Sequence, residues 1–242
     1  MGIQYFLNSL RIRPERAYGF LGALDALGFP MENVHIVWGK HWRDFEDQNA
    51  LCDAAIADGF PQMELVRNIR RPGYIAAMWS FFRTFRAIQS HNIQRAMVFE
   101  DDCTFKIPYE YVKERLNDLP KNAKIGIIGW NMRNLENKRP LKPCTEYWGL
   151  GVVNERSSHN AANFYTPEGI QMIFNLSMKK EFQTIENIIG ELHMKEGVYS
   201  LLKSIVKIHA LQGRSDAMPG EDVEDQRRIA NSDRWKQGYN VG

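Results

Sequence analysis

Residues 96 to 102 read Ala96-Met97-Val98-Phe99-Glu100-Asp101-Asp102, a short apolar run that ends in three consecutive carboxylates. Four apolar residues followed at once by negative charges predict a strand that is buried on both faces, because such strands are nearly continuous apolar runs. In open α/β sheets, ligands bind at the carboxyl ends of the strands. The stretch therefore predicts a parallel strand that brings acidic side chains to a binding site.

Adjacent carboxylates repel one another, and a bound cation, a basic partner or a raised pKa relieves that repulsion. Oxygen ligands of this kind suit a hard divalent cation such as Mn²⁺ or Mg²⁺. Neighbouring residues of an extended chain point in opposite directions, so the three side chains cannot all face one ion. Asp102 is the first candidate metal ligand and Asp101 the second. A solvated strand end with ordinary acidic residues is the alternative interpretation.

Composition limits the class of protein. A chain of 242 residues with 44% hydrophobic content can bury a sizeable core as one domain. The formal net charge of +2 comes from interspersed charges of both signs, which argues against a nucleic-acid partner. Two local basic clusters, at 67–71 and 138–142, are interpreted as solvated faces, with phosphate contact as the alternative.

Cysteine usage and apolar segments bear on the location of the protein. Cys52, Cys103 and Cys144 fit neither a disulfide framework nor a Cys-x-x-Cys metal site, which indicates a reducing compartment. The amino terminus lacks the features of a secretory signal, and no segment approaches the ~20 apolar residues that cross a membrane. We expect a cytoplasmic protein with no transmembrane segment. Peripheral membrane association and a viral protein in host cytoplasm remain open alternatives.

Short strand-like runs alternate with helical patterns along the chain. This alternation predicts an α/β fold, a Rossmann-type domain with a mostly parallel central sheet flanked by helices. We expect strands at 3–7, 34–38, 96–99 and 124–128. We expect helices from Pro14 to about Gly28, along the apolar stripe at 75–85, at 112–119, after the capping residue Thr166, and at 185–194.

The segment 131–143 is polar and basic with little periodicity, which predicts a long loop near the mouth of a site. A late apolar run covers 205–211, and the residues after it lack a sustained apolar pattern. We expect one domain over 1–213 and a polar tail or lid over 214–242.

Six short segments occur in a particular order along the chain. They are Tyr5 to Arg16, Pro72 to Ser80, Val98 to Asp102, Lys124 to Gly129, His159 to Gly169 and Gln212 to Asp216. In this order and spacing they resemble glycosyltransferase family 25, the lipooligosaccharide and collagen-type galactosyltransferases with a GT-A fold. The first segment is similar to the family's opening strand with its Asn-Leu element and Arg-Pro-x-Arg helix start, and Val98 to Asp102 stands at its acidic metal motif.

The resemblance implies a metal-dependent transfer of a hexose, galactose or glucose, from a UDP-sugar to a glycan or to a glycosylated protein or lipid, with inversion. Mn²⁺ or Mg²⁺ is the implied cofactor. The donor nucleotide is then expected at the opening segment and its neighbours, where the candidate residues are Asn8, Arg11, Arg16, Ser80 and Glu100. Glu100 is expected to contact the ribose or a water in the second coordination shell of the metal.

An inverting transfer needs a general base within hydrogen-bond reach of the acceptor hydroxyl. Glu186 and Asp216 are the candidates, although Glu186 also fits a solvated helix face and Asp216 a turn cap. His209 is a candidate metal or phosphate ligand, with a buried structural histidine as the alternative. His159 and Asn163 are expected to line the acceptor side, an assignment that depends almost wholly on the resemblance.

Aromatic residues flank the polar segment. Trp130, Tyr147 and Trp148 are candidates for stacking against an acceptor sugar, while core packing explains a tryptophan equally well. The segment 131–143 is expected to become ordered over the bound donor.

The chain departs from the family pattern at several positions. Phe81 stands where the family has a histidine, Ala76 and Ala77 replace a Gly-Cys pair, and Glu186 replaces an aspartate. These changes indicate a remote member with an altered donor or acceptor, or a catalytically silent binding module. A third reading, metal-dependent phosphotransfer or nucleotidyl transfer, is weakened by the absence of a Walker-type phosphate loop.

Overall fold

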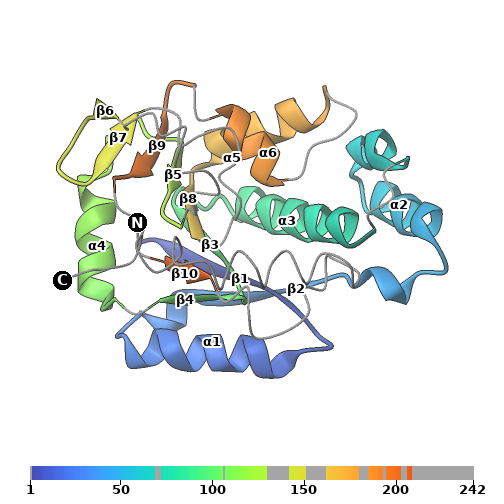
Figure 1. Ribbon diagram of the computed structural model, residues 1–242, viewed down its shortest axis with the longest axis horizontal. Helices are drawn as coiled ribbons and strands as arrows, with labels where there is room; N and C mark the ends of the chain where they lie inside the picture. Colours follow the sequence, from blue (N-terminus) through green and yellow to red (C-terminus); the bar gives the residue numbers. More distant parts are fainter. Residues whose placement is uncertain are drawn as a thin grey trace, which may run out of the picture.

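The computed structural model describes residues 2–68, 72–105, 107–129, 142–150, 162–179, 185–192, 195–202 and 206–208. Helices pack on both sides of a central sheet (Figure 1). The helices are α1 (Pro14–Ala26), α2 (Gln48–Ala57), α3 (Pro72–Ser90), α4 (Tyr109–Asp118), α5 (Pro167–Ser177) and α6 (Ile185–Leu192), with short 3-10 turns η1 (Met31–Asn33), η2 (Trp42–Asp44) and η3 (Pro61–Val66). The strands are β1 (Gln4–Leu10), β2 (Val34–Gly39), β3 (Ala96–Glu100), β4 (Cys103–Phe105), β5 (Ile125–Ile127), β6 (Lys142–Pro143), β7 (Trp148–Leu150), β8 (Ala162–Tyr165), β9 (Val198–Leu201) and β10 (Val206–Ile208).

The central sheet has eight strands in the order β2-β1-β3-β8-β5-β9-β7-β6. Strands β2, β1 and β3 are mutually parallel, and β9 is parallel to β5. Strand β8 runs antiparallel to both of its neighbours, and β7 runs antiparallel to β9 and β6. Six strands therefore share one direction, which confirms the predicted α/β class with a mostly parallel central sheet.

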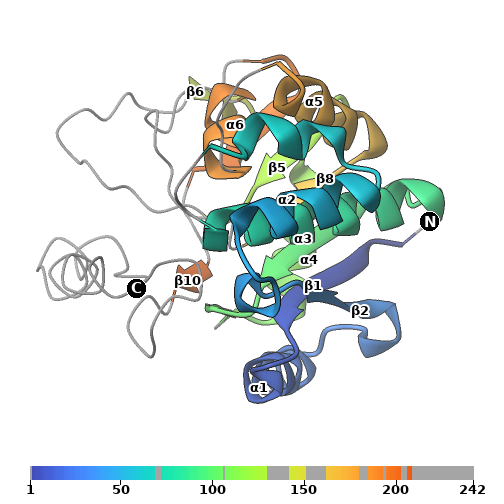
Figure 2. The same ribbon diagram turned by 90° about the vertical axis from the view of Figure 1, so that its right-hand side faces the viewer.

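Side chains alternate between the two faces of the central strands, and a layer of helices buries each face. On one face, Phe6 and Val98 pack into a cluster with α3, α5 and α6. On the other face, Leu7 and Phe99 pack into a second cluster with α1 and α4. Figure 2 shows α3 and α1 on opposite sides of β1. The two-sided burial predicted for residues 96–99 is confirmed.

Several helix boundaries follow from local chemistry. Pro14 begins α1, and Glu15 lies in its first turn, as the sequence predicts. The Thr166 hydroxyl accepts a hydrogen bond from the Gly169 N–H at 3.2 Å, which caps α5. The apolar stripe at 75–85 lies within α3, which extends through Ser90.

The late apolar run contributes a strand. Within it, β10 pairs antiparallel with β4 in a separate two-stranded sheet. Residues 142–143, expected to belong to a long loop, form β6, which pairs with β7. The remainder of that loop and the tail from 214 lie outside the described residues.

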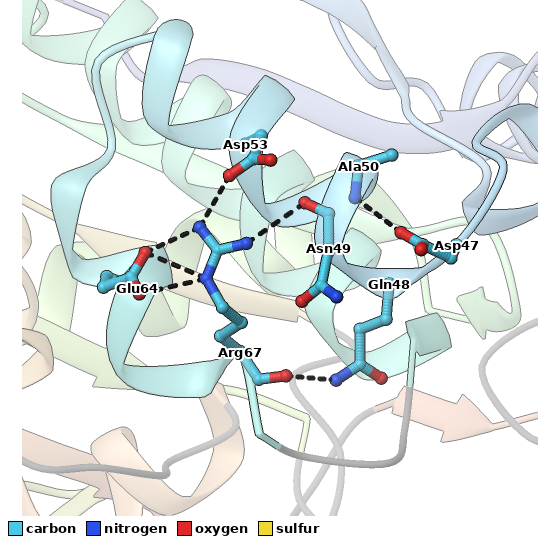
Figure 3. A network of polar contacts seen from close by, with 7 residues as sticks. All are labelled: Asp47, Gln48, Asn49, Ala50, Asp53, Glu64 and Arg67. Atoms are coloured by element: carbon cyan, nitrogen blue, oxygen red, sulfur yellow. Dashed lines mark hydrogen bonds and ion pairs between the residues drawn. The ribbon is translucent and has the colours of Figure 1, made fainter.

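Arg67 belongs to a basic cluster interpreted as a solvated face or a phosphate contact. Its guanidinium donates hydrogen bonds to Glu64 at 2.7 and 3.0 Å and to Asp53 at 2.6 Å (Figure 3). It also donates to the Asn49 carbonyl, and the Gln48 side chain donates to the Arg67 carbonyl at 2.6 Å. These bonds join the end of η3 to α2 and lower the pKa of Glu64. Arg67 therefore links η3 to α2, and two carboxylates form ion pairs with its guanidinium.

We expect Gly169→Ala to destabilise the protein by about 3 kcal/mol, because a methyl group at this position has no room. A Cβ at Gly169 would lie 2.2 Å from the Lys124 carbonyl oxygen, a backbone atom that cannot move aside by changing rotamer. Thermal and urea unfolding measure the effect. Gly22→Ala is the matched control, since Gly22 lies in α1 and its added methyl group would meet nothing within 4 Å.

The control variant should gain about 0.5–1 kcal/mol, because alanine is the better helix former. Equal unfolding free energies for the Gly169→Ala protein and the native chain would contradict the packing of α5 against the residues before β5.

Candidate active site at the carboxyl edge of the sheet

The parallel strands β2, β1 and β3 end at one edge of the sheet. Asn8 pairs with Glu100 across β1 and β3, and Leu10 pairs with Gly39 across β1 and β2. The acidic residues that follow β3 therefore lie beside the end of β1. The sheet brings together two segments that the sequence separates by about ninety residues, and both are predicted from the sequence to contribute to a site.

Asp101 is held by two side chains from the first segment. The Ser9 hydroxyl donates a hydrogen bond to Oδ2 of Asp101 at 2.5 Å. Nη1 of Arg16 lies 3.8 Å from Oδ1, and the Asp101 side chain is 13% exposed. Arg16 is therefore the basic partner that relieves part of the repulsion among the carboxylates. The structure places Arg16, predicted to bind the donor, next to a predicted metal ligand.

Glu100 and Asp102 are partly exposed, whereas Cys103 directly after them is buried. The Cys103 thiol donates to the Glu100 carbonyl at 3.0 Å. Burial raises its pKa well above the ordinary value, and the charges of Asp102, Glu100 and Asp101 raise it further. Burial therefore disfavours the thiolate form of Cys103, and the carboxylates are the groups of this turn that could hold a metal ion.

Within the part of the chain that the structure describes, no cluster of three or more His, Cys, Asp or Glu side chains forms a complete metal site. One or two carboxylates are nevertheless the usual protein share of a Mg²⁺ site, in which water and substrate phosphates fill the other positions. Asp101 and Asp102 fit that kind of site. They would not form a closed all-protein cage from the described residues.

The pairing of β10 with β4 brings a late segment next to the acidic turn. Ile208 pairs with Cys103, the residue after Asp102. His209 directly follows Ile208 in the sequence and lies outside the described residues. The proximity of the two chain segments is a non-local feature that the sequence alone did not show.

A chain of polar contacts links the carboxyl edge of the sheet to α3. The Thr84 hydroxyl donates to Oδ1 of Asn8 at 2.6 Å. One turn earlier, Ser80 accepts a hydrogen bond from the Lys40 N–H at 3.2 Å and donates to the Ala76 carbonyl at 2.8 Å. Ser80, a predicted donor-binding residue, therefore holds the chain that follows β2. Thr84 was not predicted from the sequence.

Arg11 is exposed near the end of β2. Its guanidinium carbon lies 5.9 Å from the centre of the Trp38 ring. Gly39 ends β2 in close contact with α3, since a Cβ there would lie 2.6 Å from the Ser80 hydroxyl. The lack of a side chain at Gly39 thus allows β2 and α3 to approach each other.

Of the two interpretations of Trp148, the structure supports core packing and excludes stacking against a sugar. Trp148 is fully buried, and its Nε1–H donates to the Arg115 carbonyl at 2.6 Å. Its neighbour Tyr147 is partly exposed and donates its hydroxyl hydrogen to Glu114 at 2.9 Å. Both residues join β7 to α4, and Trp148 has no face available to a sugar.

Phe81, a departure from the family pattern, and Asn163, expected on the acceptor side, both lie in the interior. Phe81 is buried on α3 and packs against Phe85 with ring centres 6.0 Å apart. Asn163 is also buried, in β8, where its amide donates to the Tyr165 hydroxyl at 3.3 Å and its backbone is in register with Val98. Phe81 therefore belongs to the apolar core and offers no titratable group.

The side chains of the remaining predicted residues lie outside what the structure describes. Glu186 lies in α6, but its side chain is not among those described. Asp216, His209, His159 and Trp130 also lie outside the described residues.

Every described helix is too short or too polar to traverse a lipid bilayer.

Comparisons with known proteins give distant likenesses. No family model and no curated protein matches the sequence. Among solved structures, the chain is similar to an active-site mutant of LgtC at 11% identity, with 97% of this chain and 99% of that chain covered and a TM-score of 0.49.

It is also similar to a glycosyltransferase involved in the glycosylation of the major capsid of PBCV-1, at 7% identity, with 95% and 98% covered and a TM-score of 0.42. A third similar structure is mouse xyloside xylosyltransferase 1 in its apo form, at 14% identity, with 80% and 69% covered and a TM-score of 0.39. These likenesses are too distant for residues to be matched one to one.

Proposed function

We propose that this chain is a metal-dependent glycosyltransferase that moves a hexose, galactose or glucose, from a UDP-sugar to a glycan or to a glycosylated protein or lipid. The observation that carries the proposal is the position of Asp101 and Asp102 at the carboxyl end of β3, beside the end of β1. This is the edge at which an α/β sheet binds its ligands. The family resemblance of the sequence supports the same activity.

Glycosyl transfer from a nucleotide diphosphate sugar requires neutralisation of the leaving diphosphate. A bound Mn²⁺ or Mg²⁺ would supply that charge as a Lewis acid. Asp102 is the first proposed ligand. Asp101, whose oxygens also meet Ser9 and Arg16, is the second. His209 is the proposed third ligand, because β10 ends beside the acidic turn one residue before it.

The nucleotide part of the donor is proposed to bind along the ends of β1 and β2. Asn8 supports this placement, because its Nδ2 is buried and has no hydrogen-bond partner among the described residues. Glu100 is in register with Asn8 and is proposed to contact the ribose. Arg11 and Arg16 supply positive charge at the same edge. Ser80 acts through the Lys40 backbone that it holds.

The acceptor hydroxyl must lose its proton as the glycosidic bond forms. Glu186 and Asp216 remain the proposed general bases. Inversion at the anomeric carbon is expected of a single displacement with one such base. The segment 131–143 is proposed to close over the donor.

Measurement of UDP release from a panel of UDP-sugars, with and without Mn²⁺, tests the proposal. We expect slow metal-dependent hydrolysis of one UDP-hexose even without an acceptor, because water can replace the acceptor hydroxyl. The addition of EDTA should abolish the release. A folded chain that binds neither UDP nor Mn²⁺ by calorimetry would exclude a glycosyltransferase.

A catalytically silent module that binds nucleotide-sugars is the second candidate. The buried Phe81 favours it, because this residue replaces a histidine of the resembling family with an apolar core residue. Such a module would bind UDP and Mn²⁺ in the same experiment and release no UDP from any sugar.

A further inference from the structure

His41 has a feature that the proposed mechanism does not use. It follows the end of β2 by two residues and is only 6% exposed. Its Nε2 is buried and has no hydrogen-bond partner among the residues that the structure describes. Buried polar side-chain atoms nearly always have a partner, because burial without one loses the hydrogen bonds that water supplied. An unsatisfied ring nitrogen at the ligand-binding edge of a sheet therefore indicates a functional role for this histidine.

The backbone that leads to His41 is firmly held. The Lys40 N–H donates to the Ser80 hydroxyl at 3.2 Å, and Arg83 donates to the Trp38 carbonyl at 3.2 Å. Gly39, which lies between Trp38 and Lys40 in the chain, is in close contact with Ser80. These contacts fix the end of β2 against α3. A side chain presented by such a rigid segment is well suited to recognise a ligand group.

Aromatic rings accumulate around the same turn. The His41 and Trp42 ring centres are 6.0 Å apart, and both Trp38 and Trp42 are partly exposed. Arginine lies over each tryptophan, with Arg11 at 5.9 Å from the Trp38 ring centre and Arg43 at 4.8 Å from the Trp42 ring centre. Nucleobases stack on such aromatic faces, and their edges need hydrogen-bonding partners.

The spacing of the strands suits a nucleoside diphosphate. The acidic turn follows β3, and His41 follows β2, with β1 between the two strands. Neighbouring strands lie about 4.8 Å apart, so the ends of β2 and β3 are separated by about 10 Å. In a nucleoside diphosphate, the ribose separates the base from the phosphates. A diphosphate near Asp102 would therefore leave the base near the end of β2.

We propose that His41 reads the nucleobase of the donor, with its Nε2 hydrogen-bonded to the edge of the base. The ring must turn toward the ligand for this contact, which the broad torsion of a histidine ring allows. The inference rests on the proposed function, because it requires a nucleoside diphosphate at this edge. It adds a residue that sets base specificity and that lies apart from the metal-binding carboxylates.

Calorimetric titrations with UDP, CDP, GDP and ADP in the presence of Mn²⁺ test the proposal. The variant is His41→Phe, which keeps a ring and removes both nitrogens. We expect about a tenfold loss of affinity for the preferred diphosphate and little change for the others. The differences in affinity among the four diphosphates should therefore become smaller. His41→Gln retains a side-chain hydrogen-bonding group and should recover part of the discrimination.

The matched control is His35→Phe, at the opposite end of β2, where the imidazole bonds to Gln4 at 2.8 Å on the surface. It should bind all four diphosphates as the native chain does. Because His41→Phe removes an unsatisfied buried nitrogen, its Tm should equal or exceed the native value. A loss of affinity in a protein whose Tm falls sharply would instead indicate a structural histidine.

The possible failures are distinguishable. If the native chain discriminates among the four bases and His41→Phe and His41→Gln discriminate equally well, the base-reading role is wrong while the proposed function stands. If the native chain binds no nucleoside diphosphate, both the proposed function and this inference are overturned.

Discussion

Asp102→Asn should lower metal-dependent UDP release by about 10³-fold, the size of effect seen when a principal electrostatic group is removed from an active site. The amide keeps the shape of the carboxylate but loses its charge, and it is a weaker ligand for Mn²⁺ or Mg²⁺. The apparent affinity for Mn²⁺ should fall along with the rate. Initial rates over a Mn²⁺ titration measure both quantities for the native chain and the variant.

Asp25→Asn is the matched control, because it removes the same charge from the exposed face of α1. It should leave both the rate and the Mn²⁺ dependence unchanged. Circular dichroism establishes that each variant is folded. If Asp102→Asn released UDP at the native rate with the native Mn²⁺ dependence, the turn after β3 would not be the metal site.

Trp148→Ala should lower the free energy of unfolding by about 4 kcal/mol, within the range for truncation of a large buried aromatic residue. The Trp148 ring is fully buried and packs beside Gly126 of β5. Its loss would leave a cavity between the sheet and α4 and would remove the hydrogen bond to the Arg115 carbonyl. Urea unfolding monitored by circular dichroism gives the change.

The control is Tyr18→Ala, which truncates an aromatic side chain that is 62% exposed on α1. Its effect should lie within about 0.5 kcal/mol, as for most surface substitutions. A tryptophan that stacks on a sugar would show the opposite behaviour, with near-native stability and weaker acceptor binding in the Trp148→Ala protein.

Local patterns predicted the elements whose causes are local. The apolar run at 96–99 requires two covering layers wherever it lies, and the structure supplies them with α3 and α1. Thr166 and Pro167 begin a helix because the hydroxyl and the fixed φ act within one turn. These parts of the fold could be predicted because few other residues influence them.

The pairing of distant segments could not be predicted. Nothing near residues 162–165 indicates that this strand runs against both of its neighbours, and nothing in 206–208 indicates a pairing with β4. The contact between Ser9 and Asp101 depends on the register of β1 with β3. Trp148 has two equal explanations in the sequence, and only the position of α4 decides between them.

Nothing in the sequence singles out His41. Its significance comes from its buried ring nitrogen, which has no hydrogen-bond partner among the described residues. Thr84 likewise lies within the apolar stripe of α3, where its hydroxyl donates to the Asn8 side chain of β1. Such polar atoms in largely apolar elements are identified only when their surroundings are known.

The reversed strand β8 constrains how the chain can fold during synthesis. Strands β1, β2 and β3 are complete once residue 100 has left the ribosome, yet the other edge of β3 pairs with residues 162–165. For some sixty further residues, the nascent chain therefore carries an apolar strand with one unpaired edge. Exposed edges of this kind invite pairing with other chains. Slow elongation between these two strands should thus increase the dependence of the yield on chaperones.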